Sequence, residues 1–82
     1  MSLSLDKLPF RTPAVVTAID WSRLSDTDAR RLRNLGFDEG VAIEALHGAP
    51  FGKDPLAIRI GRMTVAMRRA QAQVIMVEQK AA

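Results

Sequence analysis

The chain has 82 residues, of which 48% are hydrophobic and 26% charged, a composition typical of one small folded domain and not of a disordered segment. It contains no cysteine, which excludes a disulfide framework, a thiol nucleophile and a cysteine-ligated metal site, and its single histidine leaves no material for a histidine-rich one. The net charge is +3, so the basic surface suits an acidic protein, nucleic acid or an anionic membrane, or is simply solvated.

The hydropathy pattern contains neither a signal peptide nor a membrane span. Residues 1–10 lack the continuous apolar segment that a signal peptide needs. The longest uninterrupted apolar run, residues 74–77, is far shorter than the roughly 20 apolar residues of a transmembrane helix. We therefore expect a cytoplasmic protein that does not insert into the membrane, with residues 1–82 forming a single domain.

The first half of the chain predicts two strands around one helix. Residues 14–21 are rich in β-branched side chains and predict a strand, whereas no weight is given to the first three residues. Ser25 as N-cap and Gly36 as terminator predict a helix over residues 26–35. Residues 41–46 predict a second strand. The Gly- and Pro-containing segment 47–55 predicts a loop.

The second half predicts a hairpin and a closing strand. Residues 56–60 and 63–67 alternate in polarity around Gly61-Arg62, the pattern of a two-residue type II′ turn. Residues 68–73 predict a single helical turn and residues 74–77 a final strand. Five short strands with one main helix indicate a mainly β fold, a small and highly curved antiparallel barrel. The expected core consists of Leu32, Leu35, Val41, Ile43, Ile58, Val65, Met67, Ile75 and Val77.

No set of residues predicts catalysis. The segment 48–54 resembles a phosphate-binding loop, but only three residues separate its glycines and Asp54 stands where Ser or Thr should bind magnesium. His47 is interpreted as an exposed histidine at the edge of a loop, with a metal-ligand role as the alternative; in a regular strand Glu44 would project from the opposite face. We therefore expect no enzyme activity, no catalytic residue and no cofactor, a divalent metal being the open alternative.

Three runs of the sequence, in this order, resemble the ferrous-iron transport protein A family, the FeoA-like proteins. They are RLRNLGFDEG at residues 31–40, APFGKDPL at residues 49–56 and VAMRRAQAQVIMV at residues 65–77. The resemblance implies a five-stranded SH3-like barrel and an accessory role in bacterial ferrous iron uptake. It also implies a partner, the membrane ferrous iron transporter that carries a cytosolic GTP-binding domain. A structural cousin is the C-terminal SH3-like domain of iron-dependent repressors.

The expected partner surface is the loop 47–55 with the neighbouring arginines. Phe51 lies in the middle of this loop, where partner contact and local packing are equally good interpretations. Lys53, Arg68 and Arg69 would attract an acidic partner. Two alternatives remain open, a nucleic-acid-binding barrel and a metal-sensing domain using His47. Nucleic acid is not the expected partner, because the basic residues are not interleaved with surface aromatics.

Overall fold

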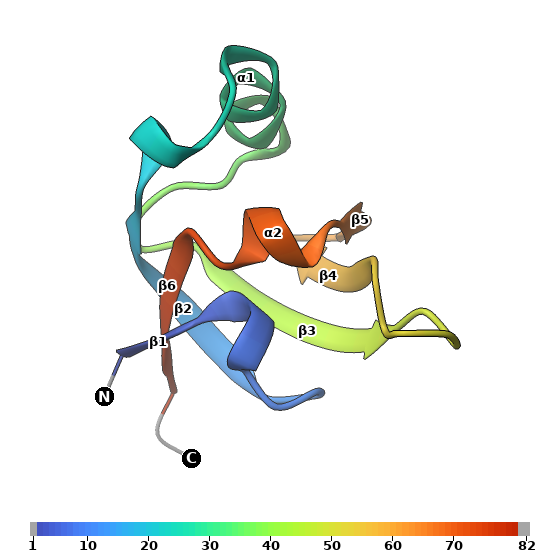
Figure 1. Cartoon of the computed structure of the whole chain (residues 1–82). Helices are drawn as coiled ribbons and strands as arrows, with labels where there is room; N and C mark the ends of the chain where they lie inside the picture. The colour runs from blue at the N-terminus through green and yellow to red at the C-terminus, as the bar shows by residue number, and fades with distance from the viewer. Residues whose placement is uncertain (1, 81–82) are drawn as a thin grey trace.

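The computed structural model describes residues 2–80 and consists of six short strands, two α-helices and two 3-10 helices (Figure 1). The mainly β fold with one main helix and a short helical turn is confirmed. In chain order the elements are β1 Ser2–Ser4, η1 Leu5–Lys7, β2 Pro13–Ile19, η2 Trp21–Arg23, α1 Asp26–Leu35, β3 Ala42–Gly48, β4 Leu56–Ile60, β5 Met63–Met67, α2 Arg69–Ala72 and β6 Ile75–Gln79.

All the strands belong to one antiparallel sheet in the order β1-β6-β2-β3-β4-β5. Strand β1 is a sixth strand that the sequence pattern does not predict. It includes Ser2 and Leu3, two of the first three residues, for which the sequence pattern predicts no element. Three residues are too few to show alternation, and this strand exists because β6 supplies partners such as Glu78 for Ser2. The sheet bends strongly, and Figure 1 shows α1 at the top of the view, above α2.

Helix α1 has the predicted bounds, since both of its ends are specified locally. The Ser25 side chain accepts a hydrogen bond from the Asp28 N–H at 3.1 Å, which satisfies one of the free amides of the first turn. At the other end Gly36 has φ +99°, a left-handed conformation that glycine adopts without strain. Leu32 is the buried residue of this helix and joins it to the core.

The first predicted strand extends too far. It ends at Ile19, whose partner Ile75 is the first residue of β6, so no strand lies opposite the residues that follow. The chain then turns into η2, and Trp21 lies in this 3-10 helix with the Arg33 guanidinium 4.4 Å above its ring. The closing strand is likewise displaced, since β6 continues to Gln79, which pairs with Ala14.

Strand β3 includes two residues that were expected in a loop, His47 and Gly48. They are strand residues because β4 supplies their partners, Ala57 and Leu56. A bulge between Ala45 and His47 has a further consequence. Glu44 pairs with Arg59 and His47 with Ala57, and these two partners lie two residues apart on one face of β4. Glu44 and His47 therefore share the outer face of the sheet, contrary to the expectation for a regular strand.

The core lies in the concave side of the sheet and is closed by helical segments. Six of the predicted core residues are buried, namely Leu32, Ile43, Ile58, Met67, Ile75 and Val77, while Leu35, Val41 and Val65 are partly buried against them. Leu5, the first residue of η1, and Leu8, which follows this helix, are also buried, and so is Phe37 after α1. The N-terminal segment is therefore an integral part of the core.

Candidate partner-binding surface

Phe51 lies at the tip of the loop between β3 and β4, and 94% of its surface is exposed. This exposure separates the two interpretations that the sequence leaves open: Phe51 contributes nothing to the core. Exposure of an apolar side chain of this size to water is unfavourable, and its burial under another surface is favourable. The loop therefore presents an unused apolar contact.

The backbone of this loop folds back onto the end of β3. Gly52 and Lys53 both adopt left-handed conformations, with φ of +72° and +53°, and the Ala49 N–H donates to the Pro55 carbonyl at 3.0 Å. Gly48 is required where the chain folds back, because a Cβ atom there would lie 2.6 Å from the Lys53 Cβ and 2.9 Å from the Lys53 Cα. The close packing of Lys53 on Gly48 gives the loop a defined shape.

Arg69, expected to be a free cation, instead holds the loop in place. Its Nε donates to the Lys53 carbonyl at 2.9 Å, and its Nη1 donates to the Asp6 carbonyl at 3.1 Å. Its backbone N–H donates to Oδ1 of Asp54 at 3.1 Å. One residue of α2 thus joins the β3–β4 loop to η1, and its guanidinium is already engaged with backbone carbonyls.

Two exposed cations belong to this region: Lys53 lies in the loop two positions after Phe51, and Arg68 precedes Arg69. The Arg68 side chain has no hydrogen bond or ion pair within residues 2–80, and the same holds for the Lys53 ammonium. Both charges are therefore available to an acidic partner. Sequence reasoning grouped Arg68 with Arg69, but the structure assigns them different tasks, and only long-range contacts that the sequence does not display distinguish the two.

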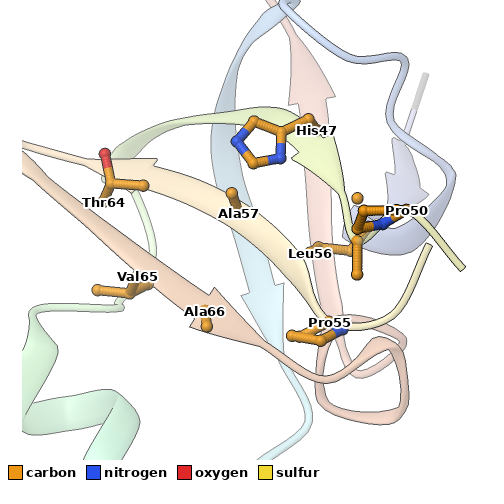
Figure 2. Close-up of a pocket in the computed structure, with 10 residues that line it drawn as sticks. His47, Pro50, Pro55, Leu56, Ala57, Thr64, Val65 and Ala66 are labelled. Atoms are coloured by element: carbon orange, nitrogen blue, oxygen red, sulfur yellow. The ribbon is translucent and has the colours of Figure 1, made fainter.

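A shallow groove of about 540 Å³ lies on the outer face of the sheet beside this loop. Figure 2 shows His47, Ala57 and Ala66 on the three neighbouring strands β3, β4 and β5, with Pro50 and Pro55 closing one end. Because Ala57 and Ala66 face each other across β4 and β5, the middle of the groove is lined by methyl groups. The sequence alternation predicts the small outward residues, but it does not predict that they form a groove.

The alternative of a metal site rests on His47 with Glu44 or Asp54. His47 is exposed, and Asp54 accepts a hydrogen bond from Arg69. Within residues 2–80 no three His, Cys, Asp or Glu side chains are grouped so that they could hold one metal ion. No helix in this same range is long and apolar enough to cross a membrane.

A strongly bent antiparallel sheet with one main helix and an exposed apolar loop residue defines a small β-domain. More specifically, the chain belongs to the FeoA domain family, whose model matches residues 3–79. This confirms the resemblance found in the three sequence runs.

Solved structures agree in fold with the chain. FeoA of Stenotrophomonas maltophilia, solved with zinc, is 34% identical with a TM-score of 0.78, the match covering 93% of this chain and 89% of that one. It is described as a prokaryotic SH3-domain protein and a candidate activating factor of ferrous iron transport. The FeoA protein of Chlorobium tepidum is 30% identical with a TM-score of 0.83, over 96% and 71% of the two chains. The fold is therefore SH3-like.

Iron(II) transport protein A of Clostridium thermocellum is 28% identical with a TM-score of 0.81, over 94% of this chain. The present chain spans only 45% of the length of that protein. A search of curated proteins found no significant match.

Proposed function

We propose that this chain is a non-enzymatic cytoplasmic accessory protein of bacterial ferrous iron uptake. Its partner is the membrane transporter that carries a cytosolic GTP-binding domain. Membership of the FeoA domain family over residues 3–79 carries the proposal, and the names of the related proteins, which refer to iron(II) transport, support the process.

The contact surface consists of Phe51, Lys53 and Arg68, with Arg69 holding the loop that presents the first two. Covering Phe51 supplies about 1.5–3 kcal/mol, because nearly all of its surface is still exposed in the free protein. Lys53 and Arg68 steer an acidic surface toward the loop, which raises the rate of association more than the final affinity. The defined shape of the loop limits the entropy that is lost on binding.

The proposal is tested by measuring binding of the chain to the purified cytosolic domain of the transporter. Phe51→Ala should weaken binding by about tenfold or more, since a loss of 1.4 kcal/mol corresponds to a factor of ten. It should leave the free energy of unfolding within about 0.5 kcal/mol of the parent value, because the side chain is exposed. Phe10→Ala is the matched control, since Phe10 is 38% exposed and lies in a different loop.

Two results would contradict the proposal. The first is unchanged transporter binding by Phe51→Ala, which would remove the loop from the interface. The second is binding to random-sequence oligonucleotides that weakens steeply with added salt while the transporter domain does not bind at all. Steep salt dependence is the signature of phosphate contacts and would favour the nucleic-acid alternative.

A further inference from the structure

Strand β5 is the last strand of the sheet within the described residues and presents an unpaired edge. Strands β4 and β5 form a hairpin with a two-residue turn, and Ile60 and Met63, the residues on either side of that turn, form a hydrogen-bonded pair. Because such pairs alternate along an antiparallel ladder, Met63, Val65 and Met67 are the β5 residues that bond to β4. The backbone N–H and C=O groups of Thr64 and Ala66 therefore point away from β4. The Ala66 carbonyl accepts a hydrogen bond from Nη2 of Arg31 at 3.2 Å, which is consistent with this direction.

Thr64 and Ala66 are also residues of the groove described above. A segment that extended the sheet at β5 would carry every second side chain on the outer face, beside the methyl groups of Ala57 and Ala66. The shallow groove can accept small apolar side chains at those positions. Backbone hydrogen bonds and a side-chain pocket thus lie next to each other at the same strand.

Basic side chains predominate around this edge, although Glu44 on β3 is the cross-strand partner of Arg59. Arg62 precedes β5, Arg68 follows it, and Arg59 is the cross-strand partner of Thr64. All three are exposed, and none of their guanidinium groups has a hydrogen bond or ion pair among residues 2–80. Arg31 adds a fourth guanidinium at Ala66. Arg62 and Arg68 lie at the two ends of the edge and Arg31 contacts Ala66, so carboxylates of an incoming segment would meet positive charge at these three places.

These charges disfavour a second copy of the same chain. If β5 paired antiparallel with β5 of another copy about Val65, Arg62 of each copy would lie opposite Arg68 of the other. Like charges facing each other across an edge oppose such pairing. The occupant must therefore be a different and acidic chain.

We propose that the β5 edge binds an extended acidic segment of the partner protein as an additional antiparallel strand, with small apolar side chains in the adjoining groove. The identification of the segment's source as the transporter rests on the proposed function. On binding, the Ala66 carbonyl exchanges the Arg31 guanidinium for an incoming backbone N–H, and Arg31 becomes available to a carboxylate.

The test uses the full chain and two acetylated ten-residue peptides, one alternating glutamate with valine and the other alternating lysine with valine. Thr64→Pro removes the outward N–H, and proline is tolerated there because that N–H takes no part in the β4 ladder. Thr64→Ala is the matched control, since it removes the hydroxyl and keeps the N–H. Circular dichroism establishes that both variants retain the sheet.

We expect the glutamate peptide to bind the parent and Thr64→Ala within twofold of each other, and Thr64→Pro at least tenfold more weakly. The lysine peptide should bind at least tenfold more weakly to all three. Amide hydrogen exchange at Thr64 and Ala66 should slow at least tenfold when the glutamate peptide is added. Should Thr64→Pro not fold, the exchange measurement on the parent decides.

Three results would overturn the proposal. The first is unchanged hydrogen exchange at the Thr64 and Ala66 amides with saturating glutamate peptide, and the second is equal binding of the two peptides. The third is a concentration-dependent dimer of the chain that protects these amides. Failure here is distinguishable from failure of the proposed function. A Thr64→Pro variant that still binds the transporter domain, beside a Phe51→Ala variant that does not, would refute the edge and retain the loop.

Discussion

Replacement of Arg69 tests whether its role depends on geometry or on charge. Arg69→Ala removes the hydrogen bonds to the Lys53 and Asp6 carbonyls at 2.9 and 3.1 Å. A hydrogen bond to a charged group contributes about 1.5–3 kcal/mol when it is shielded; since one of these is exposed and the other partly buried, we expect a loss of about 1–2 kcal/mol for the pair. In a domain of this size that loss lowers the melting temperature by about 5–15 °C.

The neighbouring residue supplies the control for this prediction. Arg68→Ala removes an equal charge from an exposed side chain and should change stability by less than about 0.5 kcal/mol. Arg69→Lys keeps the charge but cannot reproduce the forked geometry that reaches two carbonyls, so it should lose most of the same stability. Thermal unfolding followed by circular dichroism at fixed pH and salt measures all three variants. A parent-like melting temperature for Arg69→Lys would refute the reasoning, because charge alone would then be sufficient.

Two further substitutions test the loop and the N-terminal segment. Gly48→Ala places a Cβ atom 2.6 Å from the Lys53 Cβ and should destabilise the domain by about 1–3 kcal/mol in chemical denaturation, whereas an unchanged midpoint would show that the loop can move aside at no cost. Leu5→Ala removes a side chain that is fully buried and should cost about 2–5 kcal/mol by the same measurement; a loss below about 0.5 kcal/mol would mean that the N-terminal segment is not part of the cooperative core.

Elements with local signals were predictable from the sequence. Helix α1 has its cap residue Ser25 and its terminating Gly36 within a few positions of its ends, and both act through hydrogen bonds to nearby backbone. The β4–β5 hairpin has the same property, since Gly61, with φ +59°, occupies the first turn position. In each case the residues that determine the conformation are neighbours in the chain.

Elements that depend on distant partners were not predictable. Strand β1 has too few residues for a pattern and exists through pairing with β6. The bulge between Ala45 and His47, which places His47 on the outer face, is visible only in the register with β4. Arg68 and Arg69 are adjacent residues of the same type, so the sequence does not distinguish them. The hydrogen bond that gives Arg69 its role, to the Asp6 carbonyl, spans 63 positions. Likewise, the exposure of Phe51 follows from the path of the loop, which hydrophobicity alone does not determine.

The place of β6 between β1 and β2 constrains the order in which the domain can assemble. Hairpin pairs among β3, β4 and β5 join segments close in sequence and can form as soon as residue 67 has left the ribosome. Within the described residues, strand β1, in contrast, has no sheet partner other than β6, and Ile75 and Val77 of β6 are fully buried in the core. Pairings between segments this distant form slowly, because a long loop must be closed first. Until residues 75–79 leave the ribosome, the nascent chain therefore exposes the apolar faces of β1 and β2, the two strands that pair with β6. During that interval the chain is most prone to aggregate and to bind chaperones.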